Sequence, residues 1–139
     1  MTFLLDTNVI SELRRSDKAE RAVRNWADGR LKEQLFCSSI SILELEIGVL
    51  RAMRRDRPQG TTLRTWLDDH VRPNFEGRVL ALDLEIALRC AALHVPDPRP
   101  DRDAWIAATA LFHDLTVVTR NVRDFETTGV RLFNPWADG

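Results

Sequence analysis

Residues 3–8, Phe3-Leu4-Leu5-Asp6-Thr7-Asn8, decide the fold. Three apolar residues are followed directly by three polar residues. The segment 2–5 is mostly apolar, which is typical of a strand buried on both faces of a sheet. Such strands belong to α/β proteins, in which helices cover both sides of a parallel sheet. Asp6 follows the strand directly, at the place where ligand crevices form in open α/β sheets.

The rest of the chain alternates strands with helices. Amphipathic patterns predict helices at residues 9–15, 17–29, 42–55, 61–72, 84–94 and 101–113, the second with Asp17 as N-cap and with Val23 and Trp26 facing inward. Apolar runs predict further strands at 35–37, 79–80, 115–119 and 130–133. Pro58-Gln-Gly60 predicts a break inside a helical hairpin, and the prolines of 95–100 predict a loop. This order indicates an α/β three-layer fold with a central, mainly parallel sheet, in a single domain over 1–139.

The composition is that of an ordinary folded protein. Of the 139 residues, 44% are hydrophobic and 29% are charged, which excludes a disordered chain, and the net charge of −1 gives no overall attraction to nucleic acid. Cys37 and Cys90 lie in apolar segments without CxxC spacing, which favours buried thiols over a disulfide or a metal site. No signal peptide and no long apolar run is present, which predicts a cytoplasmic protein without a membrane segment.

Four acidic residues lie near the ends of predicted strands or the starts of predicted helices. Asp6 and Asp124 follow strands, whereas Glu44 and Asp103 lie near the starts of helices. Carboxylates gathered at one edge of a sheet without basic partners repel one another unless a divalent cation joins them. The pattern therefore indicates metal chemistry. Short polar residues accompany the acids at the same strand ends, namely Asn8, Thr119 and Asn121.

Asp6 and Glu44 also have purely structural interpretations. Asp6 suits an Asx-type cap of the helix that follows it. Glu44 completes a capping box that begins at Ser41, in which its side chain reaches back to the helix start. Glu46 is an alternative ligand, although it points about 200° away from Glu44 around the helix.

Asp103 and Asp124 have structural alternatives as well. A carboxylate in the first turn of a helix, such as Asp103, complements the helix dipole. Asp103 shares its helix face with the small residues Ala107 and Ala110, which favours packing toward the strand ends, so Asp101 is predicted to be the N-cap. Asp124 also fits an ordinary turn.

Four runs of sequence taken together resemble the PIN-domain family. They are Leu4-Leu-Asp-Thr-Asn-Val-Ile-Ser11, Leu43-Glu-Leu-Glu-Ile-Gly48, Asp103-Ala-Trp-Ile-Ala-Ala-Thr-Ala110 and Leu115-Thr-Val-Val-Thr-Arg-Asn-Val-Arg-Asp-Phe125. The resemblance is greatest to VapC-type toxins of bacterial toxin–antitoxin pairs, in the FitB-like branch, and extends to Phe133-Asn-Pro-Trp136. One segment departs from the family pattern. His94-Val-Pro-Asp-Pro-Arg-Pro100 replaces the Gly-Arg-Pro-Ile-like sequence that often precedes the third acid, which leaves the substrate preference open.

The resemblance implies a toxin that is a Mg²⁺- or Mn²⁺-dependent endoribonuclease. Matched by position, the catalytic acids are Asp6, Glu44, Asp103 and Asp124, with the metal at Asp6 and Asp103 and with Thr119 and Asn121 close to it. A cation held in this way orients a water molecule, lowers its pKa and neutralises the charge that develops on the phosphate. The resemblance further implies an RNA substrate, a homodimer and a cognate antitoxin that inhibits the enzyme, bound at the helices 42–55 and 61–72.

Concentrated positive charge is confined to two places. Arg14 and Arg15 end the helix that begins beside Asp6, so we expect them to border the cleft and hold an RNA backbone. The alternative is a solvated helix end that complements the dipole. The second cluster consists of Arg51, Arg54, Arg55 and Arg57.

Other phosphoryl-transfer classes fit the sequence poorly. Haloacid dehalogenases and receiver domains also place an Asp after a first strand, but both need a lysine near the phosphate, and Lys18 and Lys32 flank the second predicted helix instead. No glycine-rich turn with Gly-Lys occurs, which excludes a P-loop. The remaining alternative is a catalytically inactive PIN-fold module that binds RNA or a protein partner. It predicts no metal affinity.

Overall fold

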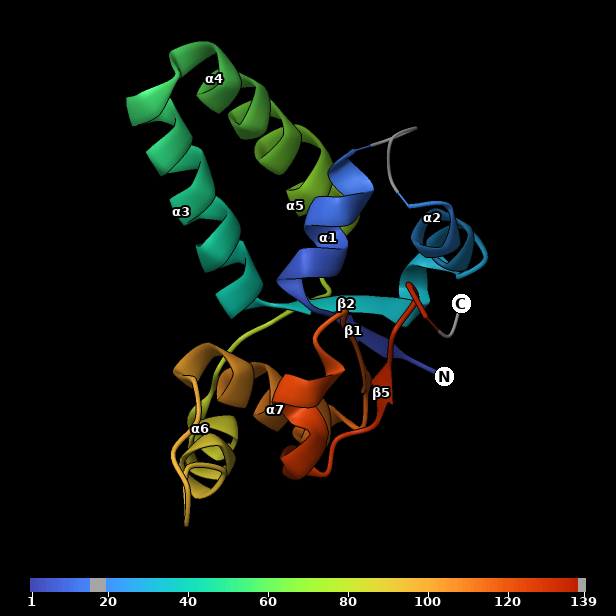
Figure 1. Ribbon diagram of the computed structural model, residues 1–139, viewed down its shortest axis with the longest axis vertical. Helices are drawn as coiled ribbons and strands as arrows, with labels where there is room; N and C mark the ends of the chain where they lie inside the picture. The colour runs from blue at the N-terminus through green and yellow to red at the C-terminus, as the bar shows by residue number, and fades with distance from the viewer. Residues whose placement is uncertain (16–19, 138–139) are drawn as a thin grey trace.

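A parallel sheet organises the molecule, and the first strand of the sequence lies at its centre. The computed structural model describes residues 1–15 and 20–137, and in them five strands pair in parallel in the order β3-β2-β1-β4-β5 (Figure 1). The strands are β1 (Phe3–Leu5), β2 (Leu35–Ser38), β3 (Val79–Leu80), β4 (Thr116–Val118) and β5 (Leu132–Phe133). The predicted α/β fold and the five predicted strands are confirmed.

Helices cover both faces of this sheet. One side carries α1 (Thr7–Arg14), α2 (Arg21–Asp28), α3 (Ser39–Arg55), α4 (Arg57–Trp66), the π-helical turn η3 (Leu67–Val71) and α5 (Arg72–Asn74) (Figure 1). The other side carries α6 (Leu84–Ala92), α7 (Asp101–His113) and the 3-10 segment η4 (Val122–Thr128). A further 3-10 turn, η2 (Lys32–Gln34), leads into β2. The predicted N-cap Asp17 lies outside the described residues.

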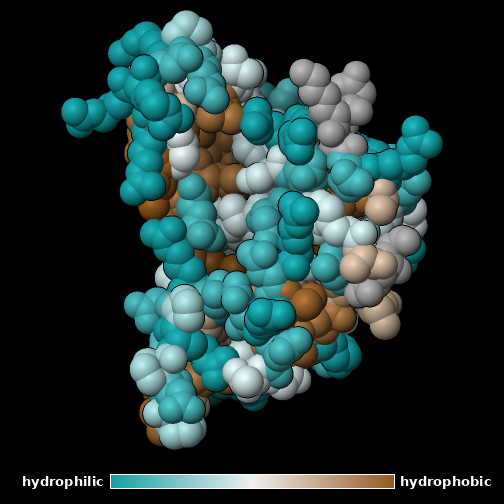
Figure 2. Space-filling view, viewed as in Figure 1, coloured by the Kyte–Doolittle hydropathy of each residue, from teal (hydrophilic) through white to brown (hydrophobic). Residues whose placement is uncertain are grey.

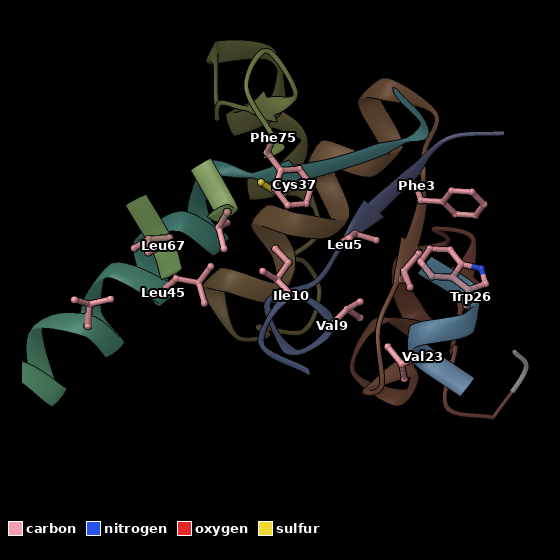
Figure 3. Close-up of a cluster of buried hydrophobic side chains, with 13 residues drawn as sticks. Phe3, Leu5, Val9, Ile10, Val23, Trp26, Cys37, Leu45, Leu67 and Phe75 are labelled. Atoms are coloured by element: carbon pink, nitrogen blue, oxygen red, sulfur yellow. The ribbon is translucent and has the colours of Figure 1, made fainter. Parts of the chain in front are cut away.

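Alternation along β1 divides the core into two clusters. Phe3 and Leu5 pack with α1, α2 and α3, where Val23 and Trp26 face inward as predicted (Figure 3). Leu4 points to the opposite face and packs with Ile106 and other side chains of α7 and η4. Successive side chains of a strand point to opposite faces, so a strand that is buried on both faces must be apolar throughout, as β1 is.

Several helix boundaries differ from the sequence prediction. Helix α3 begins at Ser39 and not near residue 42, because Ser38 is the N-cap and its Oγ accepts a hydrogen bond from the Ile40 amide at 3.1 Å. Helix α6 ends at Ala92, two residues short of His94. Asp101 is the first residue of α7 and not its cap, since Pro100 occupies the cap position without a side-chain hydrogen bond.

The predicted break between the two helices of the hairpin lies at Asp56 and not at Pro58-Gln-Gly60. Helix α4 starts at Arg57 after the cap Asp56, which places Pro58 in the first turn, where a missing amide hydrogen costs nothing. Gly60 lies within α4 and is buried against α3, because a Cβ built on it would stand 2.6 Å from the Cα and the amide nitrogen of Met53. The glycine therefore permits close helix packing and does not interrupt the chain.

Replacing Gly60 by Ala is expected to destabilise the chain by about 1–3 kcal/mol, because the backbone of Met53 must move away. Alanine gains about 1 kcal/mol in helix propensity, which only partly offsets the clash. Gly48 is the matched control, because a Cβ there meets nothing within 4 Å, and Gly48→Ala should stabilise α3. Urea unfolding of both variants checks this. Equal effects of the two substitutions would contradict the close-packing role of Gly60.

Within residues 1–15 and 20–137, none of the helices combines the length and the apolar character needed to cross a membrane.

Candidate active site

Asp6 lies where β1 ends and α1 begins. Its amide nitrogen donates to the carbonyl oxygen of Val118 at 2.9 Å, which ties the end of β1 to β4. Its carboxylate accepts short hydrogen bonds from the Thr7 amide at Oδ1 and from the Thr119 hydroxyl at Oδ2, both at 2.8 Å. Asp6 is thus the cap of α1 and is also held by β4. The cap interpretation is correct, and it still leaves the carboxylate at the sheet edge.

The predicted polar residues surround this carboxylate. The Asn8 side-chain amide lies 3.4 Å from Asp6 Oδ2 and 3.3 Å from Thr119 Oγ1. The Asn121 backbone amide donates to Thr119 Oγ1 at 3.0 Å. Asn8 and Thr119 therefore converge on Asp6 through their side chains, whereas Asn121 reaches the network through its backbone.

Glu44 points toward the same place from α3. The Thr7 hydroxyl lies 2.7 Å from Glu44 Oε1 and 2.9 Å from the Ser41 hydroxyl. A hydroxyl has a single proton, and the carboxylate can only accept, so Thr7 donates to Glu44 and Ser41 donates to Thr7. The predicted capping box is wrong because Ser38 caps α3, which frees Glu44 for the site.

Glu46, the alternative ligand, is paired with Arg64 of α4. Both of its carboxylate oxygens lie 2.7 Å from the guanidinium nitrogens of Arg64 on α4. These hydrogen bonds lower the pKa of Glu46. A bidentate pair with Arg holds the carboxylate in the α3–α4 hairpin and away from Glu44.

Glu44 has a basic partner that sequence patterns did not reveal. Arg102 Nη1 lies 3.4 Å from Glu44 Oε2 and connects α7 with α3. The premise that the acids lack basic partners is therefore wrong for Glu44. Thr7 is likewise a site residue that was not predicted from the sequence. Its position between Asp6 and Asn8, which were both predicted to belong to the site, could have indicated it.

Asp103 and Asp124 approach from the opposite side of the sheet. Asp103 is in the first turn of α7, and the buried small residues Ala107 and Ala110 hold that helix against the sheet as predicted. Burial raises the pKa of Asp103 to about 6, helped by the negative charges of Asp6, Asp124 and Glu44. Asp6 also has a raised pKa, for which burial is again the largest cause. The four predicted acids thus share one electrostatic environment.

The donor set fits a divalent cation that keeps much of its water. Among residues 1–15 and 20–137, no three His, Cys, Asp or Glu side chains are placed to hold an ion as a group. Mg²⁺ is usually bound by only one or two carboxylates together with water molecules. Burial is the largest cause of the raised pKa of Asp103, and the neighbouring negative charges add to it. A cation between the carboxylates would relieve that repulsion.

Arg14 and Arg15 do not reach the carboxylates. They end α1, about 12 Å along the helix axis from Asp6, which caps its start. The Arg14 guanidinium lies over the Trp66 ring at 5.9 Å, and Arg15 pairs with Glu12 at 3.3 Å. The length of α1 therefore separates both guanidinium groups from the acids, and their contact with an RNA backbone stays a prediction.

Acidification from pH 7 to pH 5 is expected to strengthen the Asp103 contribution to stability in the absence of metal. The folded-state pKa of about 6 lies above the ordinary value of 3.8, so the folded chain binds the extra proton. For a partly buried group this contribution to the free energy of unfolding is about 1–2 kcal/mol. It is fully present below pH 4 and is lost as the pH rises through 6. Melting curves in EDTA measure it as the difference between wild type and Asp103→Asn. A difference that does not change with pH would contradict it.

Comparison with known proteins places this α/β fold and its acidic sheet edge in a defined class. A profile of the PIN domain matches residues 3–130, and the chain belongs to the PIN-domain family. It is 38% identical over 138 residues to VapC ribonuclease Y4jK of Sinorhizobium fredii, covering 96% of each chain. It is also 38% identical over 140 residues to Toxin FitB of Neisseria gonorrhoeae, covering 97% of this chain and 99% of FitB.

Solved structures agree with this assignment. The crystal structure of FitAcB from Neisseria gonorrhoeae matches with a TM-score of 0.88 at 35% identity, covering 98% of this chain and 99% of that chain. The structure of FitAB bound to an IR36 DNA fragment matches with a TM-score of 0.88 at 32% identity, covering 97% of this chain and 96% of that chain. The predicted membership of the PIN family, with VapC-type and FitB-like relatives, is confirmed.

Proposed function

We propose that this chain is the toxin of a toxin–antitoxin pair and acts as an endoribonuclease that depends on a divalent cation. The observation that carries the proposal is that Asp6, Glu44 and Asp124, from three other segments of the chain, lie near enough to Asp103 for their negative charges to help raise its pKa. A full-length relative at 38% identity is named a VapC ribonuclease. Carboxylates that repel one another at one point of a fold cost stability, and such groups cluster at functional sites.

Asp6 and Asp103 are the proposed ligands of Mg²⁺ or Mn²⁺. When bound, such an ion lowers the pKa of a water molecule and stabilises charge on the phosphate. The chain's own groups prepare the site, because the Thr7 amide and the Thr119 hydroxyl orient Asp6, and the Thr7 hydroxyl orients Glu44.

Proton transfer falls to the carboxylates, since the four acids have no histidine beside them in the motifs. With its pKa raised to about 6, Asp103 holds a proton more readily than an ordinary Asp. Loading the site with a cation favours the ionised form, so binding should release a fraction of a proton near pH 6.

The proposed partner is an antitoxin, as in the FitAcB and FitAB complexes named above. We place it on the α3–α4 hairpin, where Leu43 and Leu50 of α3 are 43% and 53% exposed. Figure 2 shows apolar side chains in the region between α3 and α4. The homodimer, the single domain, the RNA contact of Arg14 and Arg15 and the cytoplasmic location stay predictions.

The direct test combines metal binding with RNA cleavage by the purified chain without antitoxin. We expect calorimetric binding of Mn²⁺, cleavage of total bacterial RNA with Mg²⁺ or Mn²⁺, and no cleavage in EDTA. Asp6→Asn should abolish both Mn²⁺ binding and RNA cleavage. Asp28 is an exposed acid at the end of α2, so Asp28→Asn should change neither. A folded wild type that neither binds metal nor cuts RNA would favour the inactive binding module, for which Asp6→Ala is neutral or stabilising.

A further inference from the structure

The segment that departs from the family pattern forms one wall of a cavity beside the acidic cluster. The cavity, of about 490 Å³, lies between the loop after α6 and η4, and we call it the loop cavity. Its apolar wall consists of Leu93, Val95, Pro96 and Pro98. Asp124 lines it from η4. Asp124, one of the four candidate catalytic acids, is therefore shared between the loop cavity and the candidate active site.

One side chain holds the loop cavity open. Arg99 Nε donates to the carbonyl oxygen of Leu93 at 2.7 Å, and its Nη1 donates to the Thr127 hydroxyl at 3.0 Å. These bonds fasten the two ends of the loop to each other and to η4. The walls are therefore in place before a ligand arrives, which lowers the entropic cost of binding.

The lining selects a flat, uncharged group that carries N–H donors. The apolar wall offers van der Waals contact to a ring, whereas Asp97 and Asp124 only accept hydrogen bonds. Arg99 also lines the cavity, and its guanidinium already donates to the Leu93 carbonyl oxygen and the Thr127 hydroxyl. Within residues 1–15 and 20–137, the Asp97 carboxylate has neither a hydrogen bond nor an ion pair, and it is exposed. Proteins that recognise RNA commonly take unstacked bases into such pockets and bind their edges.

We propose that the loop cavity binds the nucleobase next to the phosphate that is cut and that Asp97 selects guanine there. Guanine presents two adjacent N–H donors on its Watson–Crick edge, which one carboxylate accepts as a parallel pair, whereas adenine and cytosine present only one amino group to it. The inference rests on the proposed ribonuclease function and names the feature of the RNA that this chain reads.

The test compares cleavage-site sequences of wild type, Asp97→Asn and Asp28→Asn. Each protein is incubated with Mn²⁺ and two substrates, a pool of short RNAs randomised at every position and total bacterial RNA. The ends of the fragments are then sequenced. Wild type and Asp28→Asn should favour guanine at one position beside the cut by about tenfold or more, the discrimination expected of a bidentate contact. Asp97→Asn should cut with its guanine preference largely lost.

The outcomes separate this inference from the proposed function. Cleavage by wild type and Asp97→Asn with the same base frequencies would overturn the role of the loop cavity and leave the ribonuclease intact. A wild-type preference for a base other than guanine would overturn the assignment to Asp97. Absence of cleavage by wild type in both substrates would refute the proposed function, and the base pocket with it. Melting curves of the variants verify folding, since both substituted side chains are exposed.

Discussion

Asp103→Asn should reduce RNA cleavage by about 10²–10⁴-fold and at the same time make the metal-free chain more stable at pH 7. The activity falls because the carboxylate that is proposed to hold the cation is lost. The stability rises because the substitution removes a charge that is partly buried beside Asp6, Asp124 and Glu44. The expected gain of about 1–2 kcal/mol corresponds to an increase of about 3–5 °C in melting temperature.

The opposite signs of these two effects identify a functional acid. A residue that only supports the fold loses stability and activity together, whereas Asp103 should separate them. Calorimetry with Mn²⁺, cleavage assays and melting curves in EDTA measure the three quantities on one preparation. Addition of Mn²⁺ should raise the melting temperature of wild type and not that of Asp103→Asn. A variant that is less stable than wild type and still binds Mn²⁺ would refute the assignment.

Phe125→Ala should destabilise the chain by about 3–5 kcal/mol, the largest stability effect expected of a single substitution here. Phe125 is fully buried in the cluster formed with Leu4, Ile106 and Val117. It anchors η4, the segment that carries Asp124 at the surface. Loss of the ring leaves a cavity and releases the neighbouring Asp124, so cleavage should fall as well.

Phe112→Ala is the matched control for this prediction. Phe112 is on α7 but 37% exposed, so its truncation creates no closed cavity and should cost much less. Urea unfolding gives both values. Similar losses for the two phenylalanines would show that η4 does not depend on its buried anchor.

Local patterns were sufficient to predict the sheet and the positions of the four acids. An apolar run such as Phe3–Leu5 identifies a strand regardless of its partners, and an Asp that follows it must lie at the sheet edge. The same reasoning located Asp124, because it depends only on where a strand ends. Asp103 followed from helical phase, which relates it to the buried Ala107 and Ala110.

Features that depend on contacts between distant segments were not predicted. Ser38 and Ser41 are equally good caps in sequence, and only the end of β2 decides between them. Gly60 was interpreted as a helix breaker because its neighbour Met53 is visible only once α3 and α4 pack. Similarly, the pair between Arg102 and Glu44 joins residues 58 positions apart, a separation at which no sequence pattern applies.

The central position of β1 has a consequence for the time at which the enzyme becomes active. The hydroxyl partner of Asp6, Thr119, is made 113 residues after it, and β4 must be inserted beside β1 before the two can meet. A nascent chain that stops short of β4 contains Asp6 and Glu44 without the framework that orients them. The ribosome that synthesises this toxin is therefore not exposed to a working nuclease until β4 has been made and paired with β1.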